Sequence, residues 1–186
     1  MALRRPPALS GARTLYTAHD VARFCEVDPK TVHLWVARGL VAHALTPGGH
    51  RRFTRTDVLR LLRAHDYPLP EALTSAPARL AVMAEPERGD VEGKLKGRFE
   101  LVLNADPVTC LLRLEDVHAD ALLVVLDGPV ATAATVGRLR AHPGTRHLFV
   151  ACVGAGEPCD AAKAEGADAC GSLAAALEAT AAFFKA

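Results

Sequence analysis

The chain has 186 residues, half of them hydrophobic, which is enough to bury a core and excludes disorder throughout. Its formal net charge of +1 is unevenly distributed: residues 1–70 carry 11 lysines and arginines against 5 acidic residues, and residues 71–186 carry 11 against 16. The net charge of +6 on residues 1–70 favours binding to a polyanion, and the net charge of −5 on residues 71–186 does not.

The cysteines and the apolar runs exclude several classes of protein. The five cysteines are odd in number and lack CxxC or paired Cys/His spacing, so we expect free buried thiols rather than a disulfide framework or a zinc site: Cys25, Cys110, Cys152, Cys159 and Cys170. No signal-peptide pattern follows Met1, and no apolar run approaches the roughly 18 residues of a membrane span. We expect a cytoplasmic, nucleoid-associated protein that does not contact a membrane.

Composition divides the chain into four segments. Residues 1–13 contain prolines and arginines without an apolar period and are expected to form a flexible arm, either solvated or touching phosphate. Residues 14–68 form a first domain, and a proline-rich linker is predicted at 69–77. Residues 78–186 alternate apolar strands with alanine-rich helices, which is typical of parallel α/β layering.

Two short helices joined by a tight turn are predicted near the start of the first domain. Thr17 caps the first helix, whose apolar positions share one face: Val21, Phe24 and Cys25. Asp28 caps the second, and Pro29 occupies its first turn, where a missing amide is tolerated.

The second helix packs through one face and exposes the residues at its beginning. Its packing positions are Val32, Trp35 and Val36, with Trp35 assigned to the core rather than to base stacking, and Gly39 closes the helix as a left-handed cap. The outer N-terminal face carries Lys30, Thr31, His33 and Leu34. This geometry enters a DNA major groove, although a helical hairpin used only for packing has the same pattern.

A hairpin and a third helix are predicted next. Residues 41–45 and 50–53 are short strands joined by Thr46-Pro47-Gly48-Gly49, and the return strand carries His50-Arg51-Arg52. Adjacent arginines at a hairpin suit phosphate or minor-groove contact, with a solvated charge pair as the alternative. Thr54 and Asp57 form a capping box before a helix that closes the core through Val58, Leu61 and Leu62.

The segment "YTAHDVARFCEVDPKTVHLWVARGLV…TPGGHRRFTRTDVLRLL" resembles the winged helix-turn-helix of the MerR superfamily, in its excisionase-like or BldC-like form. The resemblance implies that the second helix lies in the major groove and that the wing holds the flanking backbone. The predicted DNA-binding residues are Lys30, Thr31, His33, Leu34, Arg38, His50, Arg51, Arg52 and Arg55. Relatives often have basic residues in place of His33 and Leu34, so base readout is expected to be weaker, or Leu34 touches a thymine methyl.

The second domain is predicted to be a doubly wound parallel sheet. The expected strands are 80–83, 101–104, 121–126 and 147–153, and the expected helices are 107–117, 131–141 and 172–185. Phrases such as "GRFELVLNAD" and "AKAEGADACGSLAAALE" resemble the receiver domain of response regulators, which has a CheY-like, flavodoxin-like fold.

The resemblance implies a phosphoacceptor pocket, but most of its residues are missing. A receiver needs an acidic pair after the first strand, an aspartate after the third, a hydroxyl after the fourth and a lysine after the fifth. The first strand ends Met83-Ala84-Glu85, which leaves one acid of the usual two, and Val125 or Asp127 follows the third strand, depending on the register. Val153-Gly154 and Gly171-Ser172 supply neither the hydroxyl after the fourth strand nor the lysine. We therefore expect a phosphorylation-independent pseudo-receiver with a vestigial pocket at Glu85 and Asp127, the alternative being phosphoryl transfer at Asp127.

One further motif resembles part of a cofactor-binding sequence. Asp116-Val117-His118 partly matches the DxHxxG cobalamin motif of light-sensing relatives of the first domain, but Ala121 replaces its glycine and the motif precedes an inner strand. We expect no cofactor, no metal and no enzymatic activity, since no nucleophile, base and orienting group can be assembled.

The sequence predicts a transcription regulator that binds double-stranded DNA. MerR regulators proper have a long dimerisation helix after the wing, which the proline-rich segment replaces here, so we expect a homodimer formed through the receiver-like domain or only on DNA. Its predicted interface comprises residues 131–141, 147–153 and 167–171, with Ala134, Val136 and Leu139 as candidates only if exposed. The alternative is a protein-interaction adaptor in which both domains dock partners.

Overall fold

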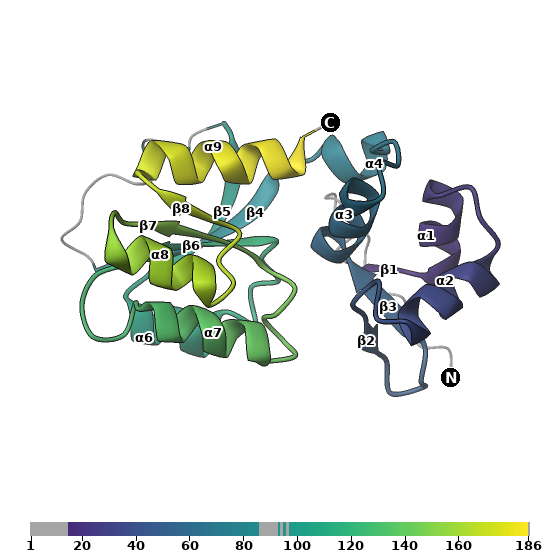
Figure 1. Ribbon diagram of the computed structural model, residues 1–186, viewed down its shortest axis with the longest axis horizontal. Helices are drawn as coiled ribbons and strands as arrows, with labels where there is room; N and C mark the ends of the chain where they lie inside the picture. The colour runs from purple at the N-terminus through teal and green to yellow at the C-terminus, as the bar shows by residue number, and fades with distance from the viewer. Residues whose placement is uncertain (1–14, 86–92, 94, 96, 186) are drawn as a thin grey trace, which may run out of the picture.

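The computed structural model describes residues 15–85, 93, 95 and 97–185. Figure 1 shows a small domain of short helices and strands beside a larger domain in which helices cover both faces of a sheet. The predicted arm at 1–13 lies outside the described residues.

The first domain contains two short helices, a three-stranded antiparallel sheet and a third helix. Its elements are β1 (Leu15–Tyr16), α1 (Ala18–Phe24), α2 (Pro29–Ala37), β2 (Ala44–Leu45), β3 (Arg51–Thr54) and α3 (Arg55–Ala64). The strand order is β1-β3-β2, so the predicted hairpin forms and gains one short strand that the sequence did not indicate.

Local sequence accounts for where these helices begin and end. Thr17 with Asp20, and Thr54 with Asp57, form two capping boxes, in which the threonine oxygen accepts the Asp backbone N–H. Gly39 has a φ of 72°, and its N–H donates to the carbonyl of Val36 while the next N–H donates to Trp35. These bonds complete a Schellman cap at the end of α2, and they confirm the left-handed cap predicted at Gly39.

The second domain is built on a five-stranded parallel sheet. Its elements are β4 (Ala78–Met83), β5 (Phe99–Ala105), α6 (Pro107–Arg113), β6 (Ala121–Val125), α7 (Ala133–Ala141), β7 (Phe149–Val153), α8 (Glu157–Ala164), β8 (Ala169–Gly171) and α9 (Leu173–Phe184). The strand order is β5-β4-β6-β7-β8. Figure 1 shows α9 on one face of the sheet and α6, α7 and α8 on the other. Covering both faces explains the continuous apolar strands.

The segment predicted as a linker is folded and joins the two domains. It contains α4 (Glu71–Thr74), whose Leu73 is fully buried. One hydrophobic cluster extends from Phe53 and Leu62 of the first domain through Leu73 to Phe184 of α9. The two domains therefore share part of their core.

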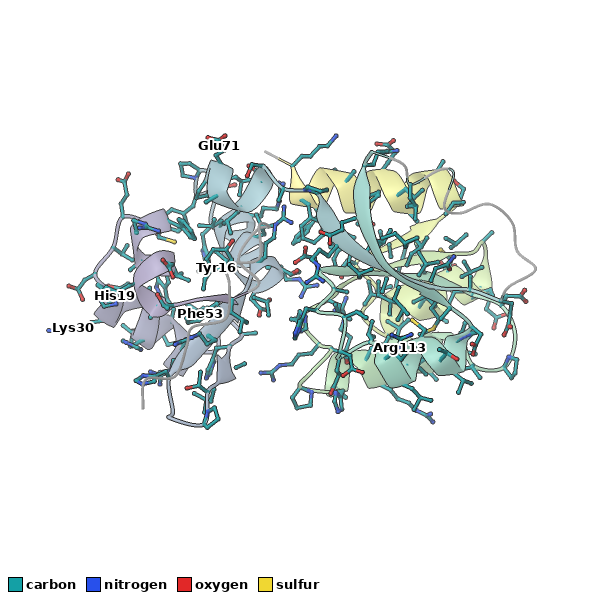
Figure 2. All side chains as sticks on the ribbon, turned by 180° about the vertical axis from the view of Figure 1, so that it is seen from behind. Tyr16, His19, Lys30, Phe53, Glu71 and Arg113 are labelled. Atoms are coloured by element: carbon teal, nitrogen blue, oxygen red, sulfur yellow. A yellow bond between two sulfur atoms is a disulfide. The ribbon has the colours of Figure 1, made fainter. Side chains whose placement is uncertain are left out.

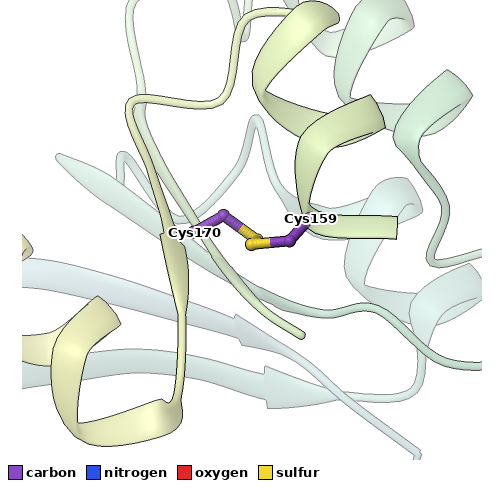
Figure 3. The surroundings of a disulfide bond; sticks show 2 residues. All are labelled: Cys159 and Cys170. Carbon is purple, nitrogen blue, oxygen red and sulfur yellow. A yellow bond between two sulfur atoms is a disulfide. The ribbon is translucent and has the colours of Figure 1, made fainter. Parts of the chain in front are cut away.

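The structure corrects one expectation about the cysteines. Cys159 and Cys170 form a disulfide between α8 and β8, although neither their spacing nor their odd number indicated one (Figure 3). Cys25, Cys110 and Cys152 are free and buried, as predicted. Within the described residues, no helix combines the length and hydrophobicity that crossing a bilayer requires.

Candidate nucleic-acid interface

The first turn of α2 lies exposed on the outer side of the first domain. The Asp28 side chain accepts the Lys30 N–H at 2.8 Å and fixes the start of the helix. Val32 is fully buried and anchors the opposite face, whereas 47% of the Leu34 surface is exposed. Figure 2 shows Lys30 at the edge of this domain farthest from the second domain. The second domain therefore leaves the beginning of α2 accessible.

The wing is a tight hairpin between β2 and β3. Gly49, with a φ of 76°, donates its N–H to the Thr46 carbonyl, and the Thr46 N–H donates to His50. Phe53 is fully buried and fixes the return strand, while His50 remains exposed. A rigid turn thus presents the basic strand at the surface.

A contact between Arg51 and His33 joins the wing to α2. The Arg51 Nη1 lies 2.8 Å from Nδ1 of His33, and Arg52 donates to the Arg51 carbonyl at 2.9 Å. The Nε of Arg51 is buried without a hydrogen-bond partner, an arrangement that costs free energy. The predicted groove-facing and wing residues are therefore brought together on one surface at His33 and Arg51.

Arg38, Thr31 and the core residue Trp35 complete the description of α2. Arg38 caps the C-terminus of α2 and is exposed, and Thr31 is half-buried in its first turn. Trp35 is partly buried, its ring 6.3 Å from that of Tyr67, which agrees with its assignment to the core.

Arg55 does not belong to this surface, and its prediction as a DNA contact is wrong. Its side chain is 1% exposed and donates to the carbonyls of Leu73 at 2.7 Å and Ala76 at 2.8 Å, and to Asp120 at 3.3 Å. The guanidinium also lies 5.1 Å from the ring centroid of Phe184. Arg55 therefore holds the two domains together.

One residue that the sequence analysis did not single out adds positive charge at the wing. Arg146, from the second domain, donates to the backbone carbonyl of His43 at the base of the wing, at 3.2 Å. The pKa of His43 is lowered by burial and then by the positive charges of Arg51 and Arg146. No local pattern predicts Arg146, because it is 103 residues from its partner.

Comparisons with known proteins assign a family to the segment that contains α1 and α2. Residues 15–66 match the family model described as "Helix-turn-helix domain". This segment is a helix-turn-helix domain. Three curated relatives are each 42% identical over 48 residues: the HTH-type transcriptional regulator MlrA of Escherichia coli strain K12 and of Salmonella typhimurium strains LT2 and SL1344. The match covers 25% of this chain and 20% of each relative.

The second domain places the two predicted acidic residues at the same edge of its sheet. Glu85 follows β4 and Asp127 follows β6, which are parallel neighbours. A Cβ built on Gly128 would lie 3.9 Å from Oε1 of Glu85, so the two loops are close. Among the described residues, no group of three or more His, Cys, Asp and Glu side chains is arranged to hold a metal ion.

The other features of the second domain lie away from this edge. Strand β6 ends at Val125, so Asp127 lies in the following loop, and Ser172 caps α9 through its hydroxyl. His118 precedes β6, at the opposite end of the strand from Asp127. Of the three candidate interface residues on α7, Val136 and Leu139 are core residues and Ala134 is exposed.

Proposed function

We propose that the chain is a transcription regulator whose helix-turn-helix domain binds double-stranded DNA, with α2 in the major groove and the wing on the flanking backbone. The contact between His33 and Arg51 supports this most strongly, because it aligns a helix start and a basic hairpin on one exposed surface. Arg51 moves from His33 to a phosphate, which also gives its buried Nε an acceptor.

The details of the domain favour a winged, MerR-like mode of binding. The hairpin follows α2 directly and is fixed by Phe53, so the wing and the helix form one rigid unit. Lys30 and Arg38, at opposite ends of α2, contact phosphates, and His33 and Leu34 face base edges. The 48-residue match to the regulator MlrA supports a DNA-binding role.

The second domain is proposed to be a phosphorylation-independent, receiver-like module rather than an enzyme. Its strand order β5-β4-β6-β7-β8 corresponds to the flavodoxin-like order 2-1-3-4-5. Glu85 and Asp127 follow β4 and β6 at its carboxyl edge, and Ser172 occupies the place of the receiver lysine. Such a domain serves for signal input or for homodimerisation, either free or on DNA. The chain then acts at the nucleoid, in the cytoplasm.

A binding assay of the full chain at several salt concentrations tests the DNA-binding role. We expect retention of specific genomic fragments in the presence of competitor DNA, with an affinity that falls steeply as salt rises. Absence of any specific complex at low ionic strength would contradict it.

Replacing Arg51 and Arg52 with alanine separates DNA binding from a protein-adaptor role. Loss of DNA retention, with the fold intact, supports the regulator. The logarithmic salt slope should fall by about 0.9 for each phosphate contact removed. Arg23→Ala is the matched control, because the Arg23 side chain is 73% exposed and lies on α1.

A further inference from the structure

The disulfide lies at the edge of the described sheet, where the backbone has few neighbours. Strand β8 has three residues and pairs with β7 alone. Cys170 is its middle residue, and Cys159 lies in the first turn of α8 (Figure 3). The disulfide therefore ties this edge strand to the helix that covers it.

Asp168, two residues before Cys170, connects this edge to the helix-turn-helix domain. Both of its carboxylate oxygens lie 2.9 Å from Nη2 of Arg60 on α3. It also accepts from Arg140 of α7 and, at 2.7 Å, from the backbone N–H of Val150. Four separate parts of the chain thus meet at one carboxylate.

Arg60 has further partners in the second domain. It donates to the carbonyls of His147 at 3.1 Å and Leu148 at 3.0 Å. The acceptors of its guanidinium therefore lie just before β7 and β8. Asp168 is the negatively charged one among them. A displacement of Asp168 leaves the Arg60 charge partly unpaired and weakens the attachment of α3.

We propose that Cys159 and Cys170 are a reversible dithiol–disulfide pair whose redox state sets how firmly Asp168 holds Arg60, and so how the helix-turn-helix domain is fixed on the second domain. The consequence for DNA binding rests on the proposed function. In the disulfide state β8 is fixed against α8 and Asp168 is in place. In the dithiol state β8 is held by its bonds to β7 and by packing alone.

The chemistry needs a disulfide oxidant of low molecular weight, such as oxidised glutathione. One cysteine thiolate attacks the glutathione disulfide, which forms a mixed disulfide and releases one glutathione thiolate. The second cysteine then attacks the mixed disulfide and releases the other. The protein loses two electrons and two protons, and the glutathione disulfide becomes two thiols.

The neighbouring Cys152 stays out of this exchange and serves as a control. Cys152 lies on β7, where it is the register partner of Cys170 on β8, and it is fully buried. Burial raises the pKa of its thiol to about 11, so it is a poor nucleophile near neutral pH. Substituting it by alanine removes a nearby sulfur and keeps the disulfide.

The redox equilibrium is measured first, on the full chain, in glutathione buffers from reducing to oxidising. After acid quenching and alkylation of the denatured protein, the oxidised form carries three alkyl groups and the reduced form five, from the three free cysteines and the disulfide pair. We expect a reversible transition between the two masses. A disulfide that stays intact at every glutathione ratio overturns the proposal.

Hydrogen exchange then reports on the attachment of α3 without reference to DNA. We expect reduction to speed exchange of amides in β8 and around Arg60 by about tenfold, through local opening. Cys159→Ser and Cys170→Ser should exchange like the reduced protein in either buffer, and Cys152→Ala should keep the redox dependence. Asp168→Asn should exchange fast around Arg60 with the disulfide intact. Unchanged exchange around Arg60 in the reduced protein overturns the proposal.

DNA affinity is compared last, for the oxidised and reduced full chain. We expect a difference of about fivefold or more, the usual size of an allosteric coupling. Equal affinities with altered exchange refute the link to DNA binding. Failure of both forms to bind DNA refutes the proposed function, and the exchange data then decide on the redox coupling alone.

Discussion

The guanidinium of Arg55 lies 3.3 Å from the carboxylate of Asp120, across the boundary between the two domains. Arg55 begins α3, and Asp120 directly precedes β6 and also accepts the Arg79 N–H at 3.0 Å. Burial raises the pKa of Asp120, and the Arg79 N–H and the Arg55 charge act against that shift. Because the pair is largely buried, loss of either partner leaves an uncompensated charge at the boundary between the domains.

Replacing Arg55 with alanine is expected to destabilise the whole chain. The change leaves Asp120 without its charged partner and removes the donor to the Leu73 and Ala76 carbonyls, so the free energy of unfolding should fall by about 3–5 kcal/mol. Urea unfolding of the full chain measures this. Arg113→Ala, on the exposed end of α6, is the control and should change stability by less than about 0.5 kcal/mol. An R55A protein of normal stability would show that Arg55 is not an interdomain anchor.

Leu34 is expected to contribute to base specificity rather than to stability. Its side chain is 47% exposed on α2, and contact with a thymine methyl removes apolar surface from water. Leu34→Ala should lower affinity for the preferred site by about 1 kcal/mol, or roughly fivefold, at unchanged thermal stability. Binding to sites in which uracil replaces thymine measures the contact.

The DNA affinity of the Leu34→Ala variant should not change when uracil replaces thymine, whereas the same replacement should weaken binding of the unaltered chain. Leu112→Ala is the matched control, because Leu112 is 78% exposed on α6 of the second domain. A Leu34 variant that loses as much affinity as the unaltered chain at uracil would place Leu34 outside the groove.

The parts of the fold that depend on neighbouring residues could be predicted from the sequence. Thr54, Asp57 and Gly39 act within one helical turn, and the apolar runs of the second domain are buried on both faces, so helix ends and inner strands follow from local patterns. The His50-Arg51-Arg52 hairpin was also predictable, because its turn residues are adjacent in the chain.

The parts that depend on tertiary contacts could not be predicted. Arg55 resembles the wing arginines in sequence, and its burial results from partners 18 to 65 residues away. Strand β1 exists only through its pairing with β3. Cys159 and Cys170 meet because α8 packs against β8, which their separation of 11 residues does not indicate.

The second domain is expected to work without phosphorylation. Glu85 and Asp127 are close at the carboxyl edge, but the hydroxyl and lysine that orient a phosphoryl group in receivers are missing. Incubation with acetyl phosphate and Mg²⁺ should leave the mass of the chain unchanged, and Asp127→Asn should bind DNA as the unaltered chain does. A mass increase of one phosphoryl group that the Asn variant lacks would identify a working phosphoacceptor.

Acidification is expected to weaken the contact between the domains through His147. Burial is the main cause of its lowered pKa, and Arg60 adds to it, while Asp57, Asp120 and a hydrogen bond to the Ala119 carbonyl act in the opposite direction. The ring is therefore neutral in the folded protein at a pH where the unfolded chain, with an ordinary pKa of about 6.5, already binds a proton. The free energy of unfolding should fall as pH decreases from about 7.5 to about 5.5, because the unfolded state takes up more protons.

Chemical unfolding of the full chain at several pH values tests this. His147→Gln, which does not titrate, should flatten the pH dependence, and the lowered pKa of His43 accounts for a residual slope of the same sign. His19→Gln, at an exposed position on α1, is the control for the substitution itself. Asp120 acts with the opposite sign, since its raised pKa makes the folded state take up a proton before the unfolded state does as the pH falls. A slope as steep in the His147 variant as in the unaltered chain would assign the acid sensitivity to other groups.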